Sequence, residues 1–201
     1  MSSGRYCVPF RRRKWGKTNY GKRKAMVVSG KPRLVARSTV NNVSVQIVVA
    51  KPKGDEVLVS ANSRELTRKY GWKAPRGNLP AAYLTGFLCG LKAKSKGVEE
   101  AILDIGFHSP TKGAKVFAVL KGALDAEVEI PHSEEKLPDE KRMMGENIAD
   151  YAKSLASNPE EYQARFSRYL EQKLQPEDIQ KHVAKVKAAM SAAFKSGGKK
   201  A

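Results

Sequence analysis

The side chains best suited to a chemical task lie near the N-terminus, where cations are interleaved with aromatic and amide residues. An arginine guanidinium group can bind a phosphate with two parallel hydrogen bonds. Tyrosine and tryptophan rings can stack on unpaired bases, and amides can read base edges. This chemistry suits RNA, although composition alone leaves DNA and RNA undecided. The candidate binding residues are Arg11, Arg12, Arg13, Lys14, Lys17, Asn19, Tyr20, Lys22, Arg23 and Lys24.

The net charge of the chain is strongly positive and concentrated at its beginning. The 201 residues contain 38 Lys and Arg against 20 Asp and Glu, which gives a formal net charge of +18. The first acidic residue is Asp55, so residues 1–54 hold fourteen Lys and Arg and no acid. Such a charge implies a polyanionic partner: nucleic acid, an anionic membrane surface or an acidic protein. Since no run approaches the ~18 consecutive apolar residues of a membrane span, we expect no membrane insertion.

Residues 1–30 form a basic arm that shows the periodicity of neither a helix nor a strand. Few of its residues could be buried and its like charges repel, so we expect it to be poorly ordered without a partner. A solvated tail and a mitochondrial targeting peptide are the alternatives, because targeting peptides are also rich in Arg and poor in acid. Trp15, Gly16, Tyr20 and Gly21 would interrupt the amphipathic helix of a targeting peptide.

Residues 31–133 are predicted to form an α/β domain with a mixed sheet, antiparallel at its start and parallel at its end. Runs of β-branched residues predict strands, and Ser63, Asn78 and Gly97 provide start and stop signals for helices. Gly86 and Gly90 would let the longest helix lie close to the sheet. The predicted order is strands at 33–38, 43–50 and 56–60, helices at 63–70 and 78–97, a strand at 101–105, a helix from 109, and a strand at 128–130.

The C-terminal third is predicted to be helical, with helices near 140–156, 159–174 and 177–195. In the last helix, apolar residues recur at i, i+4, i+7, i+11 and i+15, which gives one apolar face. This face either packs on the body of the chain or docks on a partner. Its residues are Ile179, Val183, Val186, Met190 and Phe194.

Catalytic and metal chemistry find little support. Gly16-Lys17-Thr18 resembles the end of a phosphate-binding P-loop. That motif also requires a glycine five positions before Gly16, where this sequence has Arg11. The three histidines are far apart and lack metal spacing. The two cysteines rule out a disulfide-dense scaffold and a four-cysteine zinc site, and they indicate reduced thiols in a cytoplasmic protein. We therefore predict no catalytic residue, no metal site and no cofactor.

Five segments, in order along the chain, resemble a family of large-subunit ribosomal proteins that bind 5S rRNA. The family is called protein eighteen in bacteria and archaea and protein five in eukaryotes. The last segment is similar to the opening of a C-terminal extension found in archaeal and eukaryotic members, so the chain resembles the archaeal type. The segments are FRRRKWGKTNYGKRKAMV (10–27), RLVARSTVNNVSVQIV (33–48), NLPAAYLTGFLCG (78–90), KVFAVLKGALDAEVEIPHS (115–133) and MGENIADY (144–151).

The resemblance implies a ribonuclease-H-like fold with a mixed five-stranded sheet and flanking helices. It divides the chain into a basic RNA-binding arm (1–30), an α/β 5S rRNA-binding domain (31–133) and a helical C-terminal extension (134–201). Nucleases of this fold hold two metal ions with carboxylates, one of them on the first strand. The first two predicted strands, at 33–50, contain no acid, so the fold does not imply an enzyme.

The implied role is structural. The family binds 5S rRNA and attaches it to the 23S-type large-subunit rRNA in the central protuberance, beside neighbouring ribosomal proteins, which implies a cytoplasmic ribosomal location. The resemblance adds candidates in the arm, on the sheet face, in the loop near residue 73 and after the last strand. These are Thr18, then Arg33, Arg37, Thr39 and Asn41, then Lys69, Lys73 and Arg76, and finally His132 and Ser133.

Two other functions stay open. A ribonuclease-H-like RNA-processing enzyme would show metal-dependent nuclease activity. A non-ribosomal RNA-binding or assembly factor would wash off large subunits at high salt, whereas a ribosomal component would remain bound.

Overall fold

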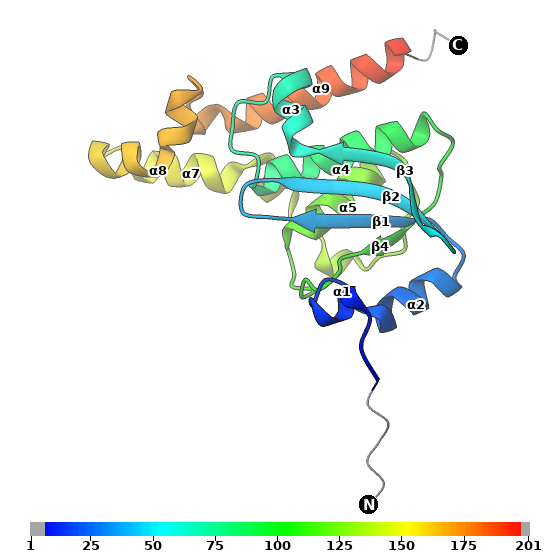
Figure 1. The fold of residues 1–201 in the computed structure, drawn as a ribbon. Helices are drawn as coiled ribbons and strands as arrows, with labels where there is room; N and C mark the ends of the chain where they lie inside the picture. The colour runs from blue at the N-terminus through cyan, green and yellow to red at the C-terminus, as the bar shows by residue number, and fades with distance from the viewer. Residues whose placement is uncertain (1–6, 198–201) are drawn as a thin grey trace, which may run out of the picture.

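The computed structural model describes residues 7–197, and within them the chain forms one four-stranded mixed sheet with helices on both sides (Figure 1). The strands are β1 (Arg33–Ser38), β2 (Val43–Lys51), β3 (Gly54–Asn62) and β4 (Ile102–Asp104). They lie in the order β3-β2-β1-β4. β2 pairs antiparallel with both β1 and β3, while β1 pairs parallel with β4. The sheet therefore begins antiparallel and ends parallel, as predicted.

The predicted fifth strand, at 128–130, does not join the sheet in the described part of the chain. Glu129 alone pairs there, in an isolated parallel bridge with Glu100. Val128 and Ile130 on either side are buried, which explains the strand-like pattern of the sequence. Pro131 follows directly, and a proline has no N–H to donate to a neighbouring strand, so the pairing ends after one residue.

Two helices, α4 (Leu79–Lys94) and α5 (Lys115–Asp125), cover one face of the sheet. α4 begins as predicted, since the Asn78 side chain accepts a hydrogen bond from the Ala81 N–H at 2.9 Å. Gly86 lies against α5 rather than the sheet, because a Cβ there would be 2.1 Å from the Val119 carbonyl oxygen. α5 starts later than the predicted residue 109, after Gly113 takes a left-handed conformation (φ +71°).

The helix α3 (Ser63–Tyr70) follows β3 directly and is capped one residue earlier than predicted. Asn62 is the cap, and its side chain accepts a hydrogen bond from the Arg64 N–H at 2.9 Å. Glu65 completes a capping box by accepting from the Asn62 N–H. The Ser63 hydroxyl instead accepts from the Val43 N–H at 3.0 Å, and so joins α3 to β2.

The basic arm contains two short helices that the sequence analysis did not predict, α1 (Arg11–Lys14) and α2 (Tyr20–Val28). They lie on the opposite side of the sheet from α4 and α5. Along β1, the buried residues Leu34 and Ala36 face the helix pair, whereas Val35 and Arg37 face the arm. This alternation leaves one face of the sheet to the core and the other to the arm.

The C-terminal extension is helical, as predicted, but its first helix is divided in two. Gly145, with φ +89°, separates α6 from α7. α8 begins at Asn158-Pro159, as the sequence indicates. The elements are the 3₁₀ turns η1 (Glu134–Lys136) and η2 (Pro176–Asp178), and the helices α6 (Glu140–Met144), α7 (Glu146–Ser154), α8 (Pro159–Glu171) and α9 (Ile179–Gly197).

The apolar face of α9 packs on the body of the chain, so the first of the two alternatives for this face is confirmed. Ile179, Val183, Val186 and Met190 are at most 1% exposed, and α9 contacts α3, α4, α6 and α7. His182 stacks on the buried Trp72 with ring centroids 5.0 Å apart. Within residues 7–197, no helix combines the length and the apolar character needed to cross a lipid bilayer.

Candidate RNA-binding surface

The basic arm is shaped by a tight turn between its two helices. Gly16 takes a left-handed conformation (φ +61°), which glycine adopts without a steric penalty. The Lys17 N–H then donates to the Arg12 carbonyl oxygen at 2.9 Å and turns the chain back. Asn19 caps α2 by accepting a hydrogen bond from the Lys22 N–H at 3.1 Å. No apolar stripe in the sequence marks α2, which begins directly after this cap.

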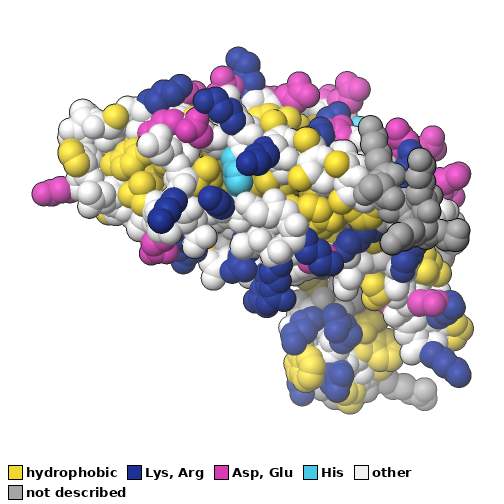
Figure 2. All heavy atoms as spheres, turned by 90° about the horizontal axis from the view of Figure 1, so that it is seen from above, with side chains coloured by type: hydrophobic (Ala, Val, Ile, Leu, Met, Phe, Trp, Pro, Cys, Tyr) yellow, Lys and Arg dark blue, Asp and Glu magenta, His cyan; other side chains and the backbone are white. Residues whose placement is uncertain are grey.

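Seven cations of the arm are exposed and have no carboxylate partner among the described residues. Figure 2 shows Lys and Arg side chains gathered on the arm, which forms the lobe at the bottom of the view. Unpaired charges of one sign raise the local potential and attract polyanions. The seven are Arg11, Arg12, Arg13, Lys14, Lys17, Lys22 and Lys24.

Aromatic rings are exposed among these cations. Phe10 is 73% exposed and Trp15 is 54% exposed. The Arg11 guanidinium and the Lys17 ammonium lie 4.9 and 5.0 Å from the centre of the Trp15 ring, in cation–π contacts. Tyr20 is half-buried, and its ring centroid is 5.4 Å from that of Phe10. Exposed rings beside cations suit the binding of unpaired nucleotides, which offer both bases and phosphates.

One ion pair attaches the arm to the sheet. Arg23 of α2 donates two hydrogen bonds to the Asp55 carboxylate of β3, at 2.7 and 2.5 Å. The Arg33 side chain of β1 donates a third, at 2.8 Å. The Arg23 guanidinium, helped by Arg33, lowers the pKa of Asp55 to about 2, against the opposing effect of desolvation. Asp55 is therefore ionised at neutral pH and holds α2 over the sheet.

A second carboxylate, Asp104 on β4, completes this network beneath the arm. It accepts hydrogen bonds from Arg33 at 3.0 Å and from Arg37 at 2.9 Å. The Gly106 N–H also donates to it, at 2.9 Å. Arg33 lies on the predicted sheet face but is only 3% exposed, so its side chain positions the two carboxylates and is not presented at the surface. The Arg37 side chain is 41% exposed and remains accessible.

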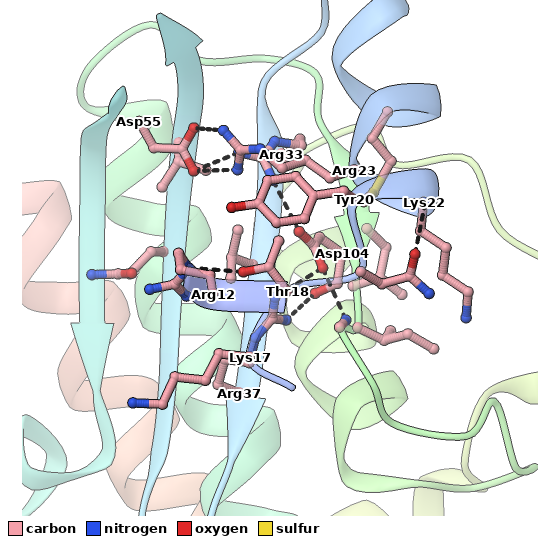
Figure 3. Close-up of a pocket in the computed structure, with 18 of the residues that line it drawn as sticks. Arg12, Lys17, Thr18, Tyr20, Lys22, Arg23, Arg33, Arg37, Asp55 and Asp104 are labelled. Carbon is pink, nitrogen blue, oxygen red and sulfur yellow. Dashed lines mark hydrogen bonds and ion pairs between the residues drawn. The ribbon is translucent and has the colours of Figure 1, made fainter. Parts of the chain in front are cut away.

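A pocket of about 870 Å³ lies between the arm and the open face of the sheet (Figure 3). Its lining contains six Lys or Arg and two Asp, and both Asp pair with arginine. The sequence analysis missed its floor, although the alternation in β2 places Gln46 and Val48 on the outer face. Sequence-predicted residues that line the pocket are Arg12, Lys17, Thr18, Asn19, Tyr20, Lys22, Arg23, Arg33 and Arg37, whereas Arg11, Arg13, Lys14 and Lys24 do not.

Thr39 and Asn41 lie in the β1–β2 turn, at the opposite end of β1 from Arg33. The Thr39 hydroxyl is occupied within the turn, where it accepts from the Asn42 N–H at 3.0 Å. Asn41 is exposed, and its side chain accepts a 3.5 Å hydrogen bond from Arg168 of α8, a residue that the sequence analysis did not select.

The loop after α3 packs directly on this turn, because a Cβ at Gly77 would lie 2.1 Å from the Val40 carbonyl oxygen. Lys73 is exposed and Arg76 is half-buried in the same loop. Lys69, at the end of α3, is exposed and lies 3.6 Å from Glu65. The turn and the loop thus form a second polar and basic surface, separate from the pocket.

His132 and Ser133 are exposed and belong to neither surface. The His132 Nδ1 lies 2.8 Å from the carbonyl oxygen of Ile130, so the ring folds back on its own segment. Cys89 is buried in α4, as expected for a core residue, and burial raises the pKa of its thiol to about 12. A thiol held in this neutral form is a poor nucleophile.

The carboxylates on the open sheet face are arranged for ion pairing. Arg33 bridges Asp55 and Asp104 with bonds of 2.8 and 3.0 Å, so each carboxylate is paired with an arginine. Among residues 7–197, no group of three His, Cys, Asp or Glu side chains is placed to hold a metal ion. Two-metal chemistry needs clustered carboxylates. In this sheet an arginine lies between the two acids.

Comparison with known proteins identifies the family. The family model described as ribosomal large subunit proteins 60S L5 and 50S L18 matches residues 4–100 and 92–133. The large ribosomal subunit protein uL18 of Caldivirga maquilingensis is 55% identical over 188 residues, which are 93% of this chain and 91% of that protein. This chain belongs to the L5/L18 family of ribosomal proteins. The resemblance inferred from five sequence segments is thereby confirmed. Because the family is structural and not enzymatic, the ribonuclease alternative is not favoured.

Proposed function

We propose that this protein is a structural component of the large ribosomal subunit that binds 5S rRNA and attaches it to the 23S-type rRNA of the central protuberance. It would work in the cytoplasm, on the ribosome. The observation that carries the proposal is a set of seven cations, unpaired among residues 7–197, on an arm that lies over an open sheet face. Family membership supplies the ribosomal context.

The two surfaces suggest how one chain could hold two RNAs. The arm (1–30) and the pocket side of the α/β domain (31–133) would bind 5S rRNA. The surface around Asn41, Lys73 and Arg168, at the other end of β1, would face large-subunit rRNA or a neighbouring ribosomal protein. The extension (134–201) supports that surface, since α8 supplies Arg168 and α9 packs on the core.

Competition binding tests the choice of RNA. The purified chain should shift labelled 5S rRNA in the presence of excess tRNA, which has a similar backbone charge but a different fold. Equal competition by tRNA and by unlabelled 5S rRNA would refute specific 5S rRNA binding. The remaining alternative, a non-ribosomal assembly factor, predicts that the chain leaves purified large subunits during a high-salt wash.

A further inference from the structure

We propose that the pocket between the arm and the sheet receives a single unpaired nucleotide of the bound RNA, with its base lying against the sheet. This inference rests on the proposed function and specifies how the RNA is recognised at that surface. A pocket of about 870 Å³ falls in the range of about 300–1,000 Å³ that is typical of small-ligand sites, so it can hold one nucleotide but no helix.

The floor of the pocket carries apolar side chains beside the Arg33 ion pairs, and this apolar part favours a base over a phosphate. Val35, Val48 and Val57 project from three adjacent strands, and Leu103 and Ile105 add a side wall from β4 and the residue after it. Val57 lies on β3, at the edge of the sheet, and is 48% exposed, so its side chain offers apolar surface to a base. A flat base can cover such side chains and remove apolar area from water, whereas a phosphate would lose hydration there without a partner.

The arm provides the opposite wall. Tyr20, Ala25 and Met26 of α2 line the pocket above the sheet. Figure 3 shows the Tyr20 ring lying over the pocket, between Thr18 and the Arg33 side chain. An aromatic ring on one side and branched aliphatic side chains on the other form a slot for a planar group.

Polar groups are placed where the edge and the backbone of a nucleotide would lie. The Gln46 side chain is exposed in the pocket and makes no hydrogen bond to any described residue, so its amide can both donate to a base edge and accept from it. Lys17 and Lys22 line the same pocket without an ion pair and can bind the flanking phosphates. The carboxylates of Asp55 and Asp104 are neutralised by arginines, so they repel a phosphate little.

Two substitutions test the slot without changing charge. Gln46→Ala removes the free amide, and Val57→Trp fills the floor, both at exposed positions where the fold should tolerate the change. We expect each to weaken 5S rRNA binding about tenfold or more. Gln46→Ala removes the hydrogen bonds to the base edge, and Val57→Trp fills the space that the base would occupy. The salt dependence of binding should stay at the wild-type slope. Gln163→Ala, at an exposed position on α8, is the matched control and should bind like wild type.

Ultraviolet crosslinking of the complex with unmodified 5S rRNA provides a second measurement. Crosslinks on the floor strands, at residues 33–37 or 46–57, support the proposal. Wild-type affinity in both variants together with crosslinks confined to the arm would overturn it, while a retained preference for 5S rRNA over tRNA would leave the proposed function intact. If the wild-type chain showed no preference for 5S rRNA over tRNA, the proposed function itself would be refuted. Circular dichroism and thermal melting confirm that the variants remain folded.

Discussion

Replacing Arg11, Arg12 and Arg13 together by alanine should weaken binding to RNA of any sequence and reduce its salt dependence. The three side chains are exposed, have no ion pair among the described residues and belong to a helix without buried residues. Alanine favours a helix, so the substitution should leave α1 and the melting temperature of the protein unchanged.

The size of the effect follows from counterion release. Each phosphate contact adds about 0.7–0.9 to the slope of log K against log salt. If all seven unpaired cations of the arm contact phosphate, the wild-type slope is about −5 to −6, and the triple variant should lose about 2–3 of it. Between about 50 and 200 mM salt, wild type would then lose roughly a thousandfold in affinity and the variant roughly a hundredfold.

Fluorescence anisotropy with labelled 5S rRNA over this salt range measures both slopes. The control removes three cations that are paired in the structure, Lys94, Lys121 and Lys153, whose partners are Glu127, Asp125 and Asp150. This control carries the same net charge as the test variant and should keep a slope near that of wild type. An unchanged slope in the arginine variant, or an equal loss in the control, would refute the assignment of phosphate contacts to the arm.

Three further outcomes are expected. Tyr20→Phe should bind RNA like wild type, whereas Tyr20→Ala should lose about 1–3 kcal/mol of RNA-binding free energy with little change in melting temperature. A fall in melting temperature that accompanies the fall in affinity would show that Tyr20 packs on the protein instead. Burial, with Lys73 nearby, lowers the pKa of His182, whose neutral ring accepts the Lys73 N–H at 3.0 Å. The His182 ring is therefore protonated more readily in the unfolded chain than in the folded one, so the free energy of unfolding should fall as the pH drops below about 6.5. Urea unfolding followed by tryptophan fluorescence measures this pH dependence, and His182→Gln should flatten it. Gly86→Ala should destabilise the fold by about 1–3 kcal/mol in the same assay, since its Cβ would lie 2.1 Å from a backbone oxygen of α5, and an unchanged midpoint would contradict this close packing.

Features of the fold that depend on nearby residues could be predicted from the sequence. The cap at Asn78 and the start of α8 at Pro159 are local signals, and the structure has both. The spacing from Ile179 to Met190 identified a buried helix face because helical periodicity is fixed by the backbone itself. The pattern could not say what covers that face, since the covering residues come from α3, α4, α6 and α7.

Features that depend on residues far apart in the sequence were missed. Arg33 and Asp104 are 71 positions apart, and Arg23 and Asp55 are 32 apart, so no local pattern connects them. The family resemblance makes Arg33 a candidate for the RNA-binding face, whereas in the structure its side chain is buried and binds the two carboxylates. The pocket depends on the same long-range pairs, which is why its arm residues were found and its floor was not.

The absence of acid from residues 1–54 acquires a physical meaning in this arrangement. The first acid, Asp55, is the residue that binds Arg23 and holds the arm over the sheet. An acid inside the arm would pair with a neighbouring cation and remove it from the binding surface. With the anchor on the sheet, one of the arm cations that the structure describes is used for attachment, and the other seven described ones remain available to phosphate. Arg23 and Asp55 thus position the arm, while the other cations of the arm are left to bind RNA. Asp55→Asn should therefore loosen the attachment of the arm to the sheet without removing any RNA-binding cation.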